Sequence, residues 1–481
     1  MSIRKSLFFS FLDRYSGLMI NILSSMVIAR LLTPAEIGVF SITMVLLTFA
    51  AAVRDMGAGQ YMVQEKNLTV EKIRSVWAIQ LGLGLALALI VVVASYPVAA
   101  FYNEPRMHDI MLVVALNYIT NPFGSLTHAW LMREMRFESS ALIRVSSTLV
   151  GALVSTGMAW KNFGPISLAF GALANTMITA LISVYFRPKH FPWLPGFSEV
   201  RQVLKFGSQL TASSIVNTVS NMAPELLLGK LQDLTAVGLF SRANGLVQMF
   251  NRLFVDAVGA VCSPWFAKQA REHGSLVPTF LKATAYVTAL GWAFCLMIVF
   301  LAYPITRVLY GTQWDASVDL ARLLAIAVAF IVPTSLCQAA LLPSAGVTVI
   351  ARLTALNALQ TVAWVAFGSW SGLMALGLAM IAASVINSLL WLQITAHKIG
   401  MSYSDLFGTL ANSAGVALMA AVGPASAMWL YGPYPTQLLP PLLLGSCGMA
   451  VGFFIGLFVL KHPLRDELFS LISVLRQRFA N

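Results

Sequence analysis

Apolar runs long enough to cross a lipid bilayer recur along nearly the whole chain, for example at 76–94, 285–301 and 442–460. A helix needs about 20 apolar residues to cross roughly 30 Å of hydrocarbon, and it satisfies its own backbone hydrogen bonds there. Charged residues make up only 10% of the 481 residues, whereas soluble domains carry about 25%. We therefore expect an all-α polytopic membrane protein.

Clusters of charged residues, prolines and glycines divide the apolar runs into about fourteen spans. The expected spans are 7–30, 37–56, 75–98, 107–131, 139–160, 164–186, 205–228, 236–260, 279–303, 317–341, 350–370, 373–396, 406–431 and 438–461. Most of the 31 Lys and Arg residues fall at cytoplasmic ends and loops if the N-terminus is inside. The positive-inside rule then predicts that both termini are cytoplasmic, and it explains the net charge of +12 without nucleic acid.

A helical hairpin occurs twice in the sequence, 200 residues apart. Residues 26–45 and 226–245 align without a gap, so that Arg30 falls on Lys230 and Gly38 on Gly238. Repeats half a chain apart are typical of secondary transporters with two homologous lobes. Because an even number of spans separates the copies, both point the same way. We expect a parallel repeat, with a pseudo-twofold axis along the membrane normal.

The repeat predicts how the chain is divided. Three prolines in the segment 187–204 block a continuous helix, so we expect a cytoplasmic linker there, between lobes at 1–186 and 205–396. The spans within 406–461 have no counterpart in the repeat. After them, apolar residues in 462–481 recur at helical spacing with arginines between them, which predicts an amphipathic helix on the cytoplasmic surface.

Polar side chains recur every three or four residues in the first span and again in the seventh, which places each set on one helix face. The two sets are Asp13, Gly17, Asn21 and Ser24, and Gln209, Ser213, Asn217, Asn221 and Glu225. Two polar stripes related by the repeat predict a hydrophilic cleft between the lobes. The alternative is that they only tie helices together by hydrogen bonds.

Two arginines lie inside the eighth span, ten residues and so about 15 Å apart. The first copy of the hairpin has Ile42 where the second has Arg242, so this charge belongs to the second copy alone. A guanidinium binds phosphate bidentately and stays charged. Arg242 and Arg252 are therefore candidate contacts to an anionic head group, although Asp256, one turn after Arg252, offers that side chain an intrahelical partner.

Further candidates follow from charge at or near membrane depth, where ionisable side chains cost free energy and usually serve function. Basic residues near span ends are candidate substrate contacts, although ion pairs or snorkelling explain such positions as well. These are Arg14, Arg30 and Lys230. The carboxylates are candidates for coupling to an ion gradient, because protonation would favour one access state. These are Asp13, Asp55, Asp256 and, foremost, Glu225.

Sequence signatures of enzymes are absent. The six histidines are isolated, and the four cysteines are single and scattered, so neither a metal site nor a disulfide framework is indicated. There is no glycine-rich phosphate loop ending in Lys-Ser/Thr, which excludes direct use of ATP by this chain. We expect a transporter with no catalytic residues, no cofactor and no metal.

Several motifs resemble the polysaccharide transporter family of the multidrug/oligosaccharidyl-lipid/polysaccharide exporter superfamily, which includes flippases of O-antigen and exopolysaccharides. The resemblance covers about residues 1–400. It rests on ARLLTPAEIGVF at 29–40, RDMGAG at 54–59, LMREMRF at 131–137, LGKL at 228–231, VGLFSRA at 237–243 and SPWF at 263–266.

The resemblance implies a V-shaped, two-lobe flippase in the bacterial inner membrane. Its substrate would be an undecaprenyl-pyrophosphate-linked oligosaccharide, moved from the cytoplasmic to the periplasmic leaflet for exopolysaccharide, O-antigen or capsule synthesis. A proton or sodium gradient would drive it, and polymerase and export machinery would be its partners. The alternatives are a cation-coupled multidrug exporter of the same superfamily and a membrane polysaccharide polymerase. The basic excess within the spans disfavours the first, and the short external loops disfavour the second.

Overall fold

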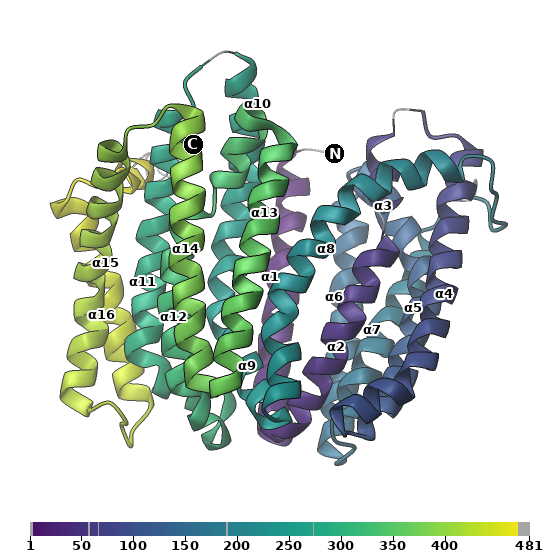
Figure 1. Ribbon diagram of the computed structural model, residues 1–481, viewed down its shortest axis with the longest axis horizontal. Helices are drawn as coiled ribbons and strands as arrows, with labels where there is room; N and C mark the ends of the chain where they lie inside the picture. Colours follow the sequence, from purple (N-terminus) through teal and green to yellow (C-terminus); the bar gives the residue numbers. More distant parts are fainter. Residues whose placement is uncertain (1–2, 56–57, 66, 189–190, 273, 470–481) are drawn as a thin grey trace. The chain divides into compact units, whose positions relative to one another are not determined.

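The structure, a computed structural model, describes residues 3–55, 58–65, 67–188, 191–272 and 274–469, and every regular element among them is helical (Figure 1). The all-α expectation is therefore confirmed. The first half contains α1 (Ile3–Leu31), α2 (Pro34–Asp55), α3 (Ala58–Gln64), α4 (Val70–Tyr102), α5 (Arg106–Arg133), α6 (Phe137–Trp160), α7 (Ile166–Tyr185) and α8 (Val200–Leu231).

The second half follows with shorter elements between its long helices. It contains α9 (Leu234–Val247), the π-helix η1 (Asn251–Val255), α10 (Asp256–Arg271), α11 (Val277–Tyr310), the 3-10 helix η2 (Thr312–Ser317), α12 (Val318–Ile331), the 3-10 helix η3 (Val332–Thr334), α13 (Cys337–Ser371), α14 (Leu373–Ile399), α15 (Tyr403–Tyr431) and α16 (Leu439–Val459). Within α13, Gly346 has a φ of +77° and breaks the helix between the spans expected at 317–341 and 350–370.

Ten helices of the described residues are long and apolar enough to cross a membrane, and each overlaps one expected span. The other four expected spans correspond to α1, α2, α8 and the segment from α9 to α10, which are the helices of the two hairpin copies. The chain is thus a multi-pass membrane protein.

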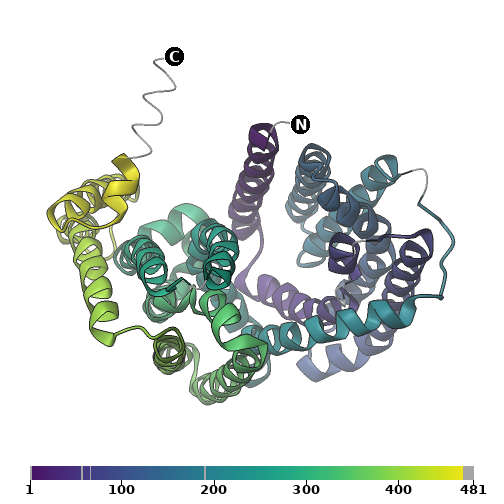
Figure 2. The same cartoon turned by 90° about the horizontal axis from the view of Figure 1, so that it is seen from above.

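The chain forms two compact units, residues 1–238 and 239–481. In the first unit α4 to α7 pack side by side, α1 packs on α6, and α8 packs on α2 and α4. In the second unit α11 to α14 pack together, and α15 and α16 lie at the edge beside α11 (Figure 2). The lobe boundaries expected at 1–186 and 205–396 stay a prediction.

The chain after α16 begins to turn back onto the second unit. Leu464 and Leu468 pack against a cluster of Ala289, Val416 and Leu457. Glu467 accepts hydrogen bonds from Lys282 Nζ at 2.8 Å and from the Tyr286 hydroxyl at 3.1 Å. The amphipathic helix expected over 462–481 is therefore docked at its start, while residues 470–481 lie outside the described part.

Candidate functional site

The two hairpin copies have the same helix ends. α1 ends at Leu31 and α8 at Leu231, whereas α2 begins at Pro34 and α9 at Leu234. The N-caps also occupy matching positions but use different chemistry. Thr33 and Glu36 form a reciprocal capping box, with the Thr33 amide donating to Glu36 Oε2 at 2.8 Å. In the second copy Asp233 accepts from the Ala236 amide at 2.6 Å. The sequence repeat is thus also a repeat of local structure.

Within the first unit the copies approach each other through two glycines. A Cβ atom added at Gly38 would collide with the carbonyl oxygen of Leu234, and one added at Gly238 would collide with that of Pro34. Since Leu234 and Pro34 are themselves equivalent in the repeat, the contact is reciprocal, as at a local twofold axis. Only a residue without a side chain allows backbones to approach so closely.

Arg242 lies on α9 against two aromatic rings of the second unit. Its guanidinium carbon is 5.5 Å from the ring centroids of both Tyr310, the last residue of α11, and Trp314 in η2. Trp314 is fully buried, and the two rings pack edge to face at 6.3 Å. Such rings attract a cation through their quadrupoles without neutralising its charge. We call Tyr310 and Trp314 the aromatic seat of Arg242.

A row of amides that sequence reasoning missed lies on the same helical segment. The Gln248 side chain donates to Asn244 Oδ1 at 3.4 Å, and the Asn251 side chain donates to Gln248 Oε1 at 2.6 Å. Their spacing places the three amides on one face. The row ends at η1, a π-helical turn within the span expected over 236–260. A local π-turn often marks a functional site. The recurrence of Asn and Gln in an apolar run was the sequence signal that could have predicted the amide row.

Lys230 is engaged at the end of α4. Its Nζ donates to the Phe101 carbonyl at 2.8 Å and lies 3.9 Å from the centroid of the Phe101 ring. A helix C-terminus favours such a cation, which gives Lys230 a structural role beside the substrate contact predicted for it. Arg30, its counterpart in the first copy, is exposed.

The predicted polar stripes are only partly described. Asn21 on α1 and Asn221 on α8 are both exposed, as their equivalence in the repeat suggests, and Glu225 is half-buried one turn after Asn221. The side chains of the other stripe and charge candidates lie outside the described part of the chain. These are Asp13, Arg14, Asp55, Gln209, Ser213, Asn217, Arg252 and Asp256, whereas Gly17 is buried and Ser24 is half-buried.

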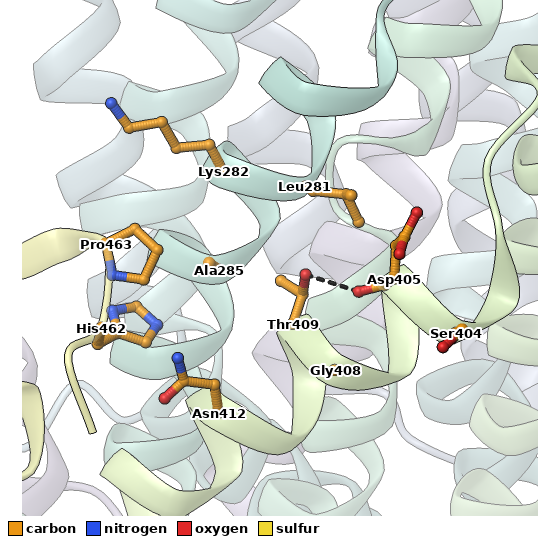
Figure 3. Close-up of a pocket in the computed structure, with 10 residues that line it drawn as sticks. All are labelled: Leu281, Lys282, Ala285, Ser404, Asp405, Gly408, Thr409, Asn412, His462 and Pro463. Atoms are coloured by element: carbon orange, nitrogen blue, oxygen red, sulfur yellow. Dashed lines mark hydrogen bonds between the residues drawn. The ribbon is translucent and has the colours of Figure 1, made fainter.

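A cavity of about 520 Å³ lies in the second unit, where α11 and α15 begin (Figure 3). Thr409 donates to the Asp405 carbonyl at 2.8 Å within it. His462 is buried at its wall, 3.2 Å from the Ser413 hydroxyl, and accepts from the Leu464 amide. Burial lowers the pKa of His462 to about 4, so its imidazole is neutral at neutral pH. These groups bond to one another, and the lining includes none of the predicted site residues.

The described residues hold no group of three or more His, Cys, Asp or Glu side chains that could bind a metal ion. Cys295 and Cys337 are buried, Cys447 is exposed and Cys262 is intermediate, and all four thiols are free.

Comparison with known proteins gives a family and a fold. The family model described as "Polysaccharide biosynthesis protein" matches residues 27–319. The succinoglycan biosynthesis transport protein ExoT of Rhizobium meliloti (strain 1021) is 23% identical over 79% of this chain and 74% of its own length. The lipopolysaccharide biosynthesis protein WzxC of Escherichia coli (strain K12) is 22% identical over 62% of this chain and 61% of its own.

Two solved structures share the fold at low sequence identity. The lipid II flippase MurJ in its inward closed conformation matches with a TM-score of 0.77 and 14% identity, covering 95% of this chain and 100% of that one. A MOP superfamily transporter from Pyrococcus furiosus matches with a TM-score of 0.58 and 13% identity, covering 83% and 95%. The fold is that of multi-span helical transporters.

Proposed function

The chain belongs to the polysaccharide biosynthesis protein family, and from this premise we propose that it is a flippase for a lipid-linked oligosaccharide repeat unit. The substrate is an undecaprenyl-pyrophosphate-linked oligosaccharide, moved from the cytoplasmic to the periplasmic leaflet of the bacterial inner membrane. The polymer made from it is an exopolysaccharide, O-antigen or capsule. The relatives named for succinoglycan transport and lipopolysaccharide biosynthesis support this, and so does the likeness of fold to a lipid II flippase.

The observation that carries the proposal is the fixed arginine of the second hairpin copy. The guanidinium carbon of Arg242 lies 5.5 Å from the ring centroids of both Tyr310 and Trp314, which position it. A positioned guanidinium pays less conformational entropy on binding, and it offers two parallel N–H donors to phosphate oxygens. Arg242 is thus suited to hold the pyrophosphate. The amide row of Asn244, Gln248 and Asn251 supplies hydrogen-bonding groups of the kind that recognise sugar hydroxyls.

Energy for transport comes, in this proposal, from a proton or sodium gradient acting on carboxylates at membrane depth. Glu225 is half-buried on α8, so its protonation state changes the cost of burying it and biases the access state of the transporter. Asn or Gln at Asp13, Asp55, Glu225 and Asp256 together should abolish the sensitivity of export to uncouplers. Unchanged export with unchanged sensitivity would exclude these carboxylates from coupling.

The direct test is to delete the gene and to ask where the lipid-linked repeat unit accumulates. Without the chain, surface polymer should be lost and the repeat unit should face the cytoplasm, out of reach of a glycosidase added to the periplasm. Restoring the wild-type chain should restore both. Normal polymer in the deletion strain, with a gain of sensitivity to cationic drugs, would favour a multidrug exporter instead. Both termini should be cytoplasmic, which reporter fusions can check.

A further inference from the structure

The length of α7 places the segment that follows it at the edge of the bilayer. α7 has 20 residues, which as a helix cover about 30 Å, the thickness of the hydrocarbon. Its ends therefore lie at the two hydrocarbon boundaries, and Arg187, two residues beyond Tyr185, lies in the head-group layer. α4, which like α7 packs on α5, has 33 residues and is longer than the hydrocarbon is thick, so its first turns also extend into that layer.

The segment 191–199 is bound to these first turns of α4. Trp77 Nε1 donates to the Trp193 carbonyl at 2.9 Å, and the Gly196 amide donates to the Arg74 carbonyl at 3.2 Å. The Phe191 side chain is buried in the core of the first unit. The segment 191–199 is thus fixed to the first unit at several points.

Arg187 positions the outermost indole of this loop. Its side chain is 8% exposed, and its Nη2 donates to the Pro192 carbonyl at 2.7 Å. The guanidinium carbon lies 4.0 Å from the centroid of the Trp193 ring and 5.1 Å from that of Trp77. A guanidinium within 6 Å of an indole centroid makes a favourable cation–π contact, and this contact restricts the orientation of the Trp193 ring.

The fixed loop nevertheless presents large apolar side chains outward. Trp193 is 54% exposed, Leu194 70% and Phe197 77%, and the Tyr185 ring at the end of α7 is 83% exposed. An apolar surface that is held rigid and left uncovered usually marks a contact with a partner or a membrane. Trp and Tyr at this depth are the residues that favour the boundary between hydrocarbon and head groups.

The charges around the loop complement phosphate. Arg74, Arg201 and Lys205 are exposed on the first turns of α4 and α8, and they outnumber the acidic Glu71 and Glu199 nearby. Cations next to an apolar loop suit phospholipid head groups, which present phosphates above acyl chains. A soluble protein would have to cover these apolar side chains at the depth of the head groups, where lipid already surrounds the helices. Phospholipid is therefore the favoured partner.

We propose that the segment Trp193–Phe197 is an interfacial anchor that binds the phospholipid surface on the linker side of the first unit. Trp193, Leu194 and Phe197 enter the boundary between head groups and acyl chains, while the surrounding basic side chains contact head-group phosphates. Arg187 is a positioning residue that keeps Trp193 turned toward the lipid. The anchor does not depend on which substrate the transporter moves.

Fluorescence quenching in vesicles tests the anchor. The full chain with Cys262→Ser and Cys447→Ser keeps only its two buried thiols, and Phe197→Cys then carries an environment-sensitive dye in phosphatidylcholine and phosphatidylglycerol vesicles. Phospholipids brominated near the head group should quench this dye strongly, and aqueous iodide weakly. The matched control is Asn67→Cys, an exposed polar position before α4, where iodide should quench more strongly than the lipid does.

The opposite pattern at position 197, with iodide dominant and lipid quenching no stronger than at position 67, would overturn the proposal and leave the loop as a water-facing surface for a protein. Adding Arg187→Gln should shift the dye several-fold toward iodide quenching, because the indole loses its cation partner. An unchanged ratio in this variant, with correctly folded protein, would show that Arg187 does not position the loop.

Discussion

The two copies of the repeated hairpin, α1–α2 and α8–α9, share their helix ends but differ at one position inside the second helix of each. Both copies end and restart their helices at equivalent residues, and both place a glycine at the point of mutual contact. Four residues after that glycine, the first copy has Ile42 and the second has Arg242. Ile42 is fully buried, and its Cδ1 fills the space that a side chain at Gly229 would need.

The same hairpin backbone thus carries different side-chain chemistry in its two copies. In the first copy position 42 contributes packing, whereas in the second copy position 242 contributes a charge held by the aromatic seat of Tyr310 and Trp314. A charged residue in a membrane helix costs free energy and is retained where it serves function. We therefore expect the shared positions to set the shape of the hairpins, and we propose that the position that differs, Arg242, recognises the substrate.

The largest effect should come from the glycines at which the copies meet. Gly38→Ala and Gly238→Ala each force a Cβ atom into a backbone carbonyl, which cannot move aside as a flexible side chain would. Little folded protein should be recovered, as judged by size-exclusion chromatography after detergent extraction. Gly245→Ala is the matched control, because an added Cβ there meets nothing within 4 Å and should be tolerated. Wild-type recovery of all three variants would refute the close approach.

Alanine at position 42 should lower the stability of the protein, whereas alanine at position 242 should lower export by protein that is still folded. Arg242→Ala loses charged hydrogen bonds of about 1.5–3 kcal/mol, so export should fall roughly 10- to 100-fold at a normal amount of protein. Export by the Arg242→Lys variant should fall less. Ile42→Ala should lower stability by about 2–5 kcal/mol while each folded molecule still exports. Polymer yield per molecule of membrane protein measures this, and equal loss of yield in Arg242→Ala and Ile42→Ala would erase the distinction.

The aromatic seat should have a smaller effect than the arginine it holds. Trp314→Leu removes one ring of the seat, and a cation–π contact contributes about 0.5–2 kcal/mol, so the apparent affinity for the lipid-linked substrate should weaken a few-fold. Tyr310→Phe keeps its ring and should behave as the wild type. Substrate titration in proteoliposomes provides the measurement. Wild-type affinity in folded Trp314→Leu protein would mean that the seat does not position Arg242.

The smallest effects should come from the caps, where the copies use different side chains at one position. Thr33→Ala and Asp233→Ala each remove an N-cap, which should cost about 1 kcal/mol of stability. Thr33→Asp should be nearly neutral, because aspartate caps the equivalent helix. Thermal unfolding in detergent can rank the three variants. A large loss in Thr33→Asp would show that the turns are not interchangeable.

The sequence predicted the features that depend on local pattern. Apolar run lengths placed the spans, and the repeated turn placed the two hairpins, because hydropathy and turn residues act locally. At these turns the expected ends of the hairpin helices differ from the observed ends by one to three residues. The tertiary partners were out of reach. Nothing near Arg242 in the sequence indicates Tyr310 or Trp314, and nothing near Arg187 indicates Trp77. The short helix α3 was also missed, because it lies between two expected spans. The π-turn at η1 was missed because it lies inside an expected span and does not interrupt it.

The account is tested most directly by leaflet translocation in vesicles that contain only the purified chain. A fluorescent undecaprenyl-pyrophosphate oligosaccharide is placed in both leaflets, and a membrane-impermeant glycosidase reports how much of it reaches the outside under an imposed ion gradient. The wild-type chain should make nearly all of the substrate accessible, Ile42→Ala should do so in proportion to its folded amount, and Arg242→Ala should leave the inner-leaflet half protected. Full accessibility with Arg242→Ala, or none with the wild type, would contradict the account.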